Sequence, residues 1–218
     1  MSESLRKIYE EHHGTARRAG FSIMKSDRGA FFSESLGTGK SILDLGCRDG
    51  ALTSFFVNGN KVTGVDIDEV SLARASESLG IETFSFDIQS DWSALNGKKF
   101  DGAVAGEFLE HVYYPQKIMG KVAEVLTADG IFVGSVPNAF SLKNRLKYLF
   151  AIKKNTPMSD PTHINQFSSK ELKSMLRKHF SEVEIVGMGR LGKIARISPQ
   201  LFAFDLCFVA RQPLNQKK

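Results

Sequence analysis

Short apolar runs alternate along most of the chain with stretches whose apolar residues recur at helical spacing. Buried parallel strands have continuous apolar runs, whereas amphipathic helices repeat apolar residues every three to four positions. These criteria predict strands at 41–45, 61–66, 81–86, 100–105 and 130–136, and helices at 50–58, 69–79 and 115–126. This alternation predicts a parallel sheet with helices on both faces.

Both ends of the chain depart from this alternation. Residues 3–13 and part of 15–36 have helical spacing, which predicts an N-terminal helical cap. Near the other end, a helix is predicted from Ser168 or Ser169 to about Lys178. Strand patterns follow at 181–188 and 201–213 with no crossover helix between them, which predicts an antiparallel hairpin.

A long connection, residues 138–167, lies between the alternating part and the final helix. Its first half has helical spacing at Leu142, Leu146, Leu149 and Phe150, and its second half is polar. Long connections at the ligand edge of such sheets often serve as lids or recognition elements. Residues 189–200 fit either a dimer contact or a loop over the pocket, so the oligomeric state stays open.

We therefore expect an α/β fold in one domain, residues 1–218, with a doubly wound, seven-stranded and mainly parallel sheet. The predicted parts are a helical cap (1–38), a ligand-binding core (40–136), a lid (138–167), and a C-terminal helix with closing strands (168–213).

Composition and charge exclude several classes of protein. The chain has 42% apolar and 24% charged residues, as is usual for a globular protein, and no apolar run approaches the roughly 18 residues that span a membrane. Two cysteines without metal-type spacing and a polar N-terminus favour the cytoplasm. The net charge of +5 fits an anionic partner or a solvated surface equally well.

The most informative segment is KSILDLGCRDG, residues 40–50, an apolar run that ends in an acid and a glycine-bounded turn. Asp44 beside exposed backbone amides offers both an acceptor and donors, which suits a zwitterionic amino-acid moiety. Asp66 closes the next strand about twenty residues on, where a carboxylate binds the two hydroxyls of a ribose. Gly46 and Gly50 lack the spacing of a nicotinamide-dinucleotide loop, so the pattern favours a nucleoside that carries an amino acid.

The chain resembles class I S-adenosylmethionine-dependent methyltransferases of the type 11 and type 23 group. That group includes ubiquinone-pathway O-methyltransferases and proteins associated with methionine biosynthesis. The matching segments are ILDLGCRDGALT, VTGVDIDEVSLARA, FSFDIQ, FDGAVAGEFLEHV and LTADGIFVGSVPN, which together cover about residues 40–138 in the family's order. The resemblance implies a Rossmann-like fold, S-adenosylmethionine as cofactor and S-adenosylhomocysteine as product.

The resemblance also implies which residues bind the cofactor. Asp44, Gly46 and Gly50 would hold the methionine end, and Asp66 the ribose. Asp87 and Ile88 would lie against the adenine, where the Asp87 carboxylate could instead cap a turn. The other members of the implied set are Cys47, Arg48, Ile67, Gly106 and Glu107. Arg48 stands where the family commonly has glycine, and we expect its side chain to point outwards. Arg28, in the cap, is a candidate for covering the cofactor.

Glu107, Glu110 and His111 follow the fourth predicted strand, where the reactive methyl group should lie. A histidine titrates near neutral pH and is suited to deprotonating a hydroxyl. Two acids and a histidine also suit Mg²⁺ or Mn²⁺. A similar cluster is associated with a divalent metal in ubiquinone-pathway enzymes. RNA 3′-terminal 2′-O-methyltransferases carry a related one, but with further histidines that we do not find in this sequence. A purely structural role is the main alternative, so our expectation is no metal, with these three residues as weak candidates.

His163, at the end of the long connection, is the second candidate catalytic residue beside His111; it either faces the substrate or anchors the lid. The predicted function is methyl transfer to a small-molecule acceptor, at a hydroxyl. The alternatives are an RNA- or protein-directed methyltransferase, which the basic segment 143–154 favours and the lack of a nucleic-acid module disfavours, and a non-catalytic cofactor-binding protein.

Overall fold

The computed structural model describes residues 24–214 of the chain. The predicted helix at 3–13 therefore lies outside the described residues, as does the beginning of the N-terminal cap. The described part of the cap is the helix α2 (Lys25–Leu36), which ends at Gly37.

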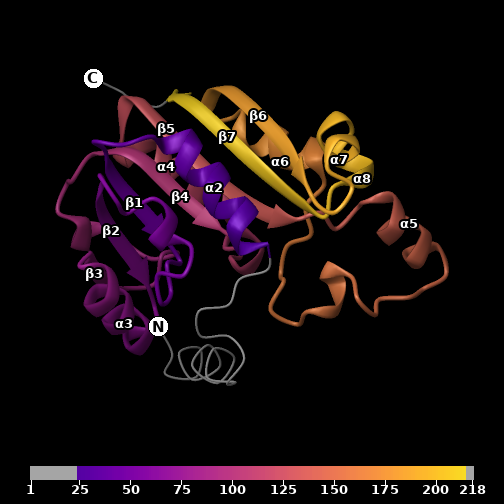
Figure 1. Cartoon of the computed structure of the whole chain (residues 1–218), viewed down its shortest axis with the longest axis horizontal. Helices are drawn as coiled ribbons and strands as arrows, with labels where there is room; N and C mark the ends of the chain where they lie inside the picture. Colours follow the sequence, from indigo (N-terminus) through magenta and orange to yellow (C-terminus); the bar gives the residue numbers. More distant parts are fainter. Residues whose placement is uncertain (1–23, 215–218) are drawn as a thin grey trace.

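The centre of the molecule is a seven-stranded sheet in the order β3-β2-β1-β4-β5-β7-β6 (Figure 1). Its first five strands pair in parallel, whereas β7 runs antiparallel to both of its neighbours. The seven strands are β1 (Ser41–Leu45), β2 (Lys61–Asp66), β3 (Glu82–Ser85), β4 (Phe100–Gly106), β5 (Leu126–Pro137), β6 (Phe180–Met188) and β7 (Asp205–Pro213). The predicted fold class, with its antiparallel C-terminal hairpin, is confirmed.

Helices cover both faces of the sheet, as the alternating pattern predicted. The helices α3 (Glu69–Leu79), α4 (Pro115–Val125) and α6 (Ser169–Leu176) match their predicted positions to within a few residues. One apolar cluster joins α4 and α6 to the sheet, and a second joins α2 and α3 to the opposite face. Because successive side chains of a strand point to opposite faces, Leu43 and Leu45 belong to the first cluster and Ile42 to the second.

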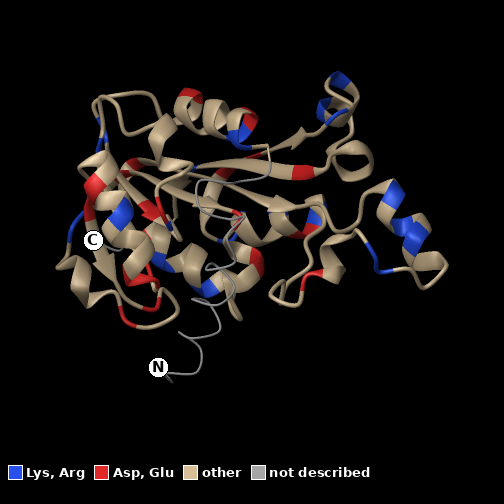
Figure 2. Ribbon diagram, turned by 60° about the horizontal axis from the view of Figure 1, so that its bottom comes forward, with Lys and Arg blue, Asp and Glu red and all other residues tan. Residues whose placement is uncertain are grey.

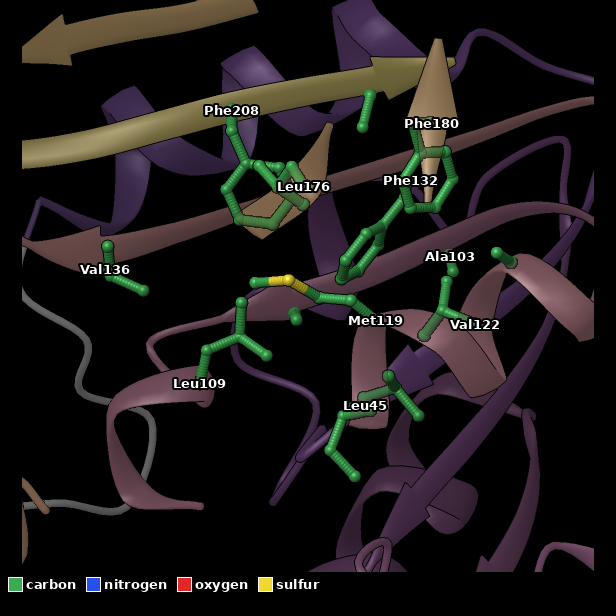
Figure 3. Packing of buried hydrophobic residues seen from close by; sticks show 14 of the residues in the cluster. Leu45, Ala103, Leu109, Met119, Val122, Phe132, Val136, Leu176, Phe180 and Phe208 are labelled. Carbon is green, nitrogen blue, oxygen red and sulfur yellow. The ribbon is translucent and has the colours of Figure 1, made fainter. Parts of the chain in front are cut away.

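Aromatic rings fill the first cluster where β5 and β7 lie side by side. The ring of Phe132 packs against Phe208, with centroids 5.0 Å apart, and against Phe180, at 5.9 Å (Figure 3). Met119 and Leu176 approach the same rings from the helices α4 and α6. This packing fixes β7 inside the sheet and therefore fixes the position of the residues at its beginning.

Two expectations about secondary structure were wrong. In place of the predicted helix at 50–58, the chain forms turns and one 3₁₀ segment, η1 (Thr53–Phe55). Two hydroxyl groups of this 3₁₀ segment form hydrogen bonds: Ser54 Oγ donates to Ala51 O, and Thr53 Oγ1 donates to Asp44 in the sheet. Side-chain hydrogen bonds of this kind compete with a regular helix. The strand predicted at 201–213 begins only at Asp205.

The remaining segments, 138–167 and 189–204, carry short helices at one end of the molecule (Figure 1). The helical spacing predicted in the long connection is confirmed as α5 (Leu142–Leu149), with Ser141 as its N-cap. After it comes the 3₁₀ segment η4 (Pro157–Ser159). Residues 189–200 hold α7 (Lys193–Ile197) and the start of α8 (Pro199–Phe202), which contacts α5.

Candidate functional site

A cavity of about 1730 Å³ lies at the edge of the sheet where the parallel strands have their carboxyl ends. The loops after the first five strands line it, together with parts of 141–163 and 189–205. Ligands bind at this edge in open α/β sheets. The cavity exceeds the usual volume of a small-ligand pocket, roughly 300–1,000 Å³, and so has room for a cofactor and an acceptor together.

The loop after β1 depends on backbone conformations that favour glycine. Gly46 and Gly50 have φ angles of 70° and 78°. A Cβ atom on Gly46 would lie 2.6 Å from the Phe108 ring, and one on Gly50 would lie 2.5 Å from Leu79 Cδ1. Both glycines are therefore required by the turn itself. Because the helix predicted at 50–58 does not form, no helix dipole adds to the electrostatics of this loop.

Asp44 is buried at the carboxyl end of β1 and lines the cavity. Thr53 Oγ1 donates a hydrogen bond of 2.7 Å to its carboxylate. Burial raises the pKa of Asp44 to about 7, and the charge of Asp66 adds to the rise, while the Thr53 hydrogen bond opposes it. A ligand ammonium group would favour the ionised form, so this carboxylate is suited to binding a cation.

Asp66, at the end of β2, has a fixed orientation. Its carboxylate accepts hydrogen bonds from the backbone N–H groups of Ile67 (2.7 Å), Asp68 (3.0 Å) and Arg48 (3.0 Å). Arg48 has a φ of 49°, so its backbone bends towards Asp66. Our expectation that its side chain points outwards was wrong, because Arg48 lines the cavity and its Nε atom is buried.

The loop after β3 lines the cavity together with the loops after β1 and β2. Asp87 Oδ1 accepts from the backbone N–H of Gln89 at 2.9 Å, so one carboxylate oxygen caps the turn, as the alternative reading predicted. Trp92 Nε1 donates to Ile88 O at 2.7 Å and braces the same turn from the core. Asp87 and Ile88 both line the cavity, as do Ile67 and Cys47.

Glu107, after β4, belongs to a buried network of charges. Its backbone has a φ of 54°, and its carboxylate contacts Arg28 Nη1 at 3.2 Å and accepts from Ser135 Oγ at 3.1 Å. Arg28 Nε lies 3.8 Å from Asp205 Oδ2, at the beginning of β7. Neither oxygen of Asp205 has a hydrogen-bond partner, and burial, together with the charge of Glu107, raises the pKa of Asp205 well above its usual range.

The sequence analysis did not single out Asp205. The sequence signal that could have identified Asp205 is its position at the start of the apolar run DLCFVA. Aspartate is rarely buried without a partner, so an acid at the start of a buried strand indicates a specific role. Arg28 was expected to cover the cofactor. It lines the cavity but lies buried between Glu107 and Asp205, so the acidic network holds it in place.

Glu110, His111 and His163 come together in the wall of the cavity, where the loop after β4 meets the end of the long connection. Their potential ligand atoms all lie within 4.8 Å of one another, and the two imidazole rings meet edge to face with centroids 5.0 Å apart. His163 thus takes the place that Glu107 had in the predicted cluster, because Glu107 turns towards Arg28 instead. Glu110 is buried and neither of its oxygens has a hydrogen-bond partner.

Backbone carbonyl groups fix both histidine rings. His111 Nδ1 lies 3.0 Å from Thr162 O, and His163 Nδ1 lies 3.1 Å from Pro157 O. A carbonyl oxygen only accepts, so each Nδ1 carries a proton and the neutral ring has its lone pair on Nε2. These Nε2 atoms lie near carboxylates: 3.9 Å from Glu110 for His111, and 3.8 Å from Asp160 for His163. Both rings are therefore oriented to accept a proton or to bind a cation.

The strand order, the glycine turn after β1 and the acids after β1, β2 and β3 define a Rossmann-like nucleoside-binding domain. Comparison with known proteins identifies its family. Residues 16–179 match the family described as methyltransferase domain, and the chain belongs to this family. Its fold is that of class I S-adenosylmethionine-dependent methyltransferases.

Two curated relatives illustrate the range of the family. The chain is 28% identical to a small RNA 2′-O-methyltransferase of Schizosaccharomyces pombe over 193 residues, which cover 71% of this chain and 49% of the relative. It is 34% identical to a ubiquinone biosynthesis O-methyltransferase of Nitrosococcus oceani over 123 residues, which cover 52% of this chain and 49% of the relative. The chain thus spans about half the length of the curated relatives it matches.

Solved structures confirm the fold. A methyltransferase from Archaeoglobus fulgidus superposes with a TM-score of 0.65 at 19% identity, covering 94% of this chain and 98% of its own. The plantazolicin methyltransferase, solved with S-adenosylhomocysteine bound, superposes with a TM-score of 0.64 at 14% identity, covering 97% and 91%.

S-adenosylmethionine, the cofactor of this family, fits the residues present. Its amino-acid end requires an acceptor for the ammonium group, and the buried Asp44 in the cavity wall would supply one. The amides of Gly46, Arg48 and Gly50 donate within the chain, so they form the turn itself. Asp66 is oriented at the end of β2, where the ribose is expected, and Ile67 and Ile88 offer apolar surface beside it. Between residues 24 and 214, no helix is both long enough and apolar enough to cross a membrane.

Proposed function

We propose that the protein transfers the methyl group of S-adenosylmethionine to a hydroxyl group of a small-molecule acceptor. The observation that carries this proposal is the cluster of Glu110, His111 and His163 beside the loop after β4. Thiol and carboxylate acceptors need no base, whereas a hydroxyl group benefits from one. Two histidines that lie beside each other in the cavity wall match that need.

In this proposal the chain contributes positioning and proton transfer. Bound S-adenosylmethionine supplies a methyl group already activated by its sulfonium. Asp44 and Asp66 fix the two ends of the cofactor, and the cavity walls exclude water from the acceptor. His111 or His163 takes the hydroxyl proton at Nε2 as the acceptor oxygen attacks, while the carbonyl at Nδ1 holds the ring in place. The carboxylate of Asp160, 3.8 Å from His163 Nε2, would stabilise an imidazolium formed on His163. Burial and the charge of Glu107 raise the pKa of Glu110 well above its usual range, so Glu110 is less suited to this role.

A second candidate role for the cluster is to bind a divalent cation that orients the acceptor hydroxyl. The specific support is Glu110, whose two oxygens are buried without hydrogen-bond partners, since a buried carboxyl group normally has them. Two imidazole nitrogens and a carboxylate suit Mn²⁺, Fe²⁺ or Zn²⁺ better than Mg²⁺. The cation would be held by Glu110, His111 and His163 and would lower the pKa of the acceptor hydroxyl.

The first test separates cofactor binding from acceptor chemistry. Calorimetric titration with S-adenosylhomocysteine, with NADH as control, should show binding that Asp66→Ala weakens tenfold or more. An acceptor panel of phenols, catechols, sugars and short RNA is then assayed with S-adenosylmethionine, with and without EDTA. Methylation of a small-molecule hydroxyl that His163→Ala abolishes and His179→Ala leaves intact would support the proposal, since His179 lies outside the cavity.

The other outcomes have distinct meanings. Loss of activity in EDTA that Mn²⁺ restores would assign the cation role to the cluster. Preferential methylation of RNA would overturn the small-molecule assignment, and tight cofactor binding without methylation of any acceptor would favour a non-catalytic protein.

A further inference from the structure

The segments 138–159 and 189–204, which we call the basic apolar surface, have an unusual composition. Together they contain eight lysine or arginine residues and no aspartate or glutamate. They also contain nine of the 14 large apolar side chains that are exposed among the described residues. These nine are Leu142, Leu146, Leu149, Phe150, Ile152, Leu191, Ile194, Ile197 and Phe204.

The two segments form one surface although some thirty residues separate them in the sequence. Asn138 Nδ2 donates to Pro199 O and to Ala203 O, each at 3.0 Å, which ties the start of one segment to the end of the other. The helix α5 contacts α8, and α8 contacts α7. Figures 1 and 2 show α5 and α7 at the same end of the molecule, with Lys and Arg on both.

The helix α5 is amphipathic in a way that suits an interface. Leu142, Leu146 and Leu149 recur at positions i, i+4 and i+7 and share one face, yet all three are exposed, Leu149 by 76%. Lys143, Arg145 and Lys147 occupy other positions of the same helix, which contains no aspartate or glutamate. A helix of a globular protein normally buries such an apolar stripe. Here the stripe and Ile197, which is 84% exposed, have no core to cover them within the described residues.

The same surface surrounds the acceptor end of the cavity. Leu142, Leu146, Leu191 and Phe204 are exposed and also line the cavity, and so do Lys143 and Arg190. These exposed residues make part of the cavity lining both apolar and cationic. The cavity is therefore continuous with the basic apolar surface.

We propose that the basic apolar surface docks on an anionic lipid membrane and that the acceptor is an amphiphile that enters the cavity from it. Charge complementarity selects anionic lipid headgroups, which attract clustered Lys and Arg. The apolar side chains select acyl chains over nucleic acid, because seven of the nine are Leu or Ile, whereas single-stranded RNA stacks on aromatic rings. Lysines and arginines beside exposed Leu and Phe are typical of helices that lie in the membrane interface. The inference that the acceptor is an amphiphile rests on the proposed function. The inference that the surface docks on a membrane is independent of it.

The test is sedimentation of the whole chain with vesicles of phosphatidylcholine, with or without phosphatidylglycerol. We expect binding only to vesicles that contain phosphatidylglycerol, and weaker binding at high salt. The double variant Leu149→Glu, Ile197→Glu should lose affinity about tenfold or more, because two apolar side chains leave the interface and two like charges enter it. Neither residue lines the cavity, so binding of S-adenosylhomocysteine should stay unchanged.

Val70→Glu, Tyr114→Glu is the matched control, since both residues are exposed apolar side chains outside this surface. Absence of binding to phosphatidylglycerol vesicles, or equal loss in the control, would overturn the proposal. A wild-type dimer in light scattering that the double variant dissociates would assign the surface to a second copy of the chain, and single-stranded RNA that displaces vesicles would assign it to nucleic acid. Vesicle binding and turnover are measured separately, so docking without methyl transfer would refute the proposed function alone.

Discussion

The cavity has a cofactor half, lined by Asp44, Asp66 and Asp87, and a proposed acceptor half, lined by Glu110, His111, His163 and Asp205. The two halves differ in the number of hydrogen bonds that their carboxyl groups accept. In the cofactor half, Asp66 accepts three backbone hydrogen bonds, Asp87 accepts one, and Asp44 accepts from Thr53. In the acceptor half, neither Glu110 nor Asp205 has a hydrogen-bond partner, although both are buried. The cofactor half is thus organised by the chain itself, whereas the acceptor half has buried carboxyl groups whose missing hydrogen bonds a bound cation or acceptor would supply.

This difference corresponds to the local structure of the two halves. The acids of the cofactor half lie at or just after the ends of parallel strands, so the sheet that positions them also presents nearby amides. The residues of the acceptor half come from the loop after β4, from β7 and from the long connection, and they meet only through tertiary packing. A site whose polar groups are already hydrogen-bonded is suited to a cofactor that is the same in every reaction cycle. A site with polar groups that lack partners is suited to a ligand that supplies the missing charge or hydrogen bonds.

The largest expected effect is on turnover when the acceptor half is changed. His163→Ala should lower kcat/KM about 10²–10⁴-fold, since general-base catalysis contributes that much. Calorimetry should give the same S-adenosylhomocysteine affinity for the variant and the wild type, because His163 has no role in the cofactor half. A parallel loss of cofactor affinity would show that the two halves are not separate.

A smaller effect, of about tenfold or more in Kd, is expected when Asp66 is replaced by alanine. This change removes both the proposed ribose acceptor and the group that orders the backbone N–H of Arg48 and Ile67. Asp101→Ala, which removes an acceptor of Ser41 N outside the cavity, is a suitable control. Unchanged affinity in Asp66→Ala would refute the ribose assignment.

Cofactor binding should depend on pH through Asp44. The pKa of Asp44 is about 7 in the folded protein, so below that pH the ligand ammonium must displace a proton. The apparent Kd of S-adenosylhomocysteine should then rise by up to about tenfold per pH unit as the pH falls below 7, and level off above it. Titrations at pH 5.5 to 8.5 should show this slope for the wild type and not for Asp44→Asn.

The same raised pKa has a consequence for stability. Because the pKa of Asp44 is higher in the folded than in the unfolded chain, its contribution to stability is present at low pH and is lost as the pH rises through 7. Asp44→Asn should therefore melt higher than the wild type at pH 8 and no higher at pH 4. Equal melting temperatures at pH 8 would contradict the buried, ionised state of Asp44.

The smallest effect concerns two helix caps outside the cavity lining. Asp68 caps α3, which follows the cofactor-half strand β2, by accepting from Val70 N, Ser71 N and Ser71 Oγ, whereas Ser168 caps α6 by accepting from Glu171 N. Asp68→Ala should cost about 1–2 kcal/mol of unfolding free energy, and Ser168→Ala about 0.5–1 kcal/mol. Urea denaturation measures both, and a larger cost for Ser168→Ala would contradict this ranking.

Much of the cofactor half could be predicted from the sequence, because its parts are local. Each acid stands at the end of an apolar run, and the distance between Asp44 and Asp66 fits one strand-to-strand crossover. The same local argument was wrong about the helix at 50–58, since Thr53 and Ser54 use their hydroxyl groups elsewhere. Helical spacing alone contains no information about such competition.

The acceptor half could be predicted only in pieces. Glu110, His111 and His163 were each identified, but their meeting depends on the way segment 138–167 folds back, which no periodicity reveals. The inclusion of Glu107 in the metal cluster failed for a similar reason, because Arg28 comes from a helix some eighty residues earlier. Asp205 was missed since its environment is formed by strands from distant parts of the sequence.

The insertion of β7 between β5 and β6 sets the order in which the protein becomes competent during synthesis. Until β7 has left the ribosome, β5 and β6 have no partner on their facing edges, and Asp205 is absent from the network with Arg28 and Glu107. The nucleoside-binding loops precede this strand by more than a hundred residues and are translated long before it. A nascent chain therefore contains all the proposed nucleoside-binding loops before it contains the strand that completes the acceptor half.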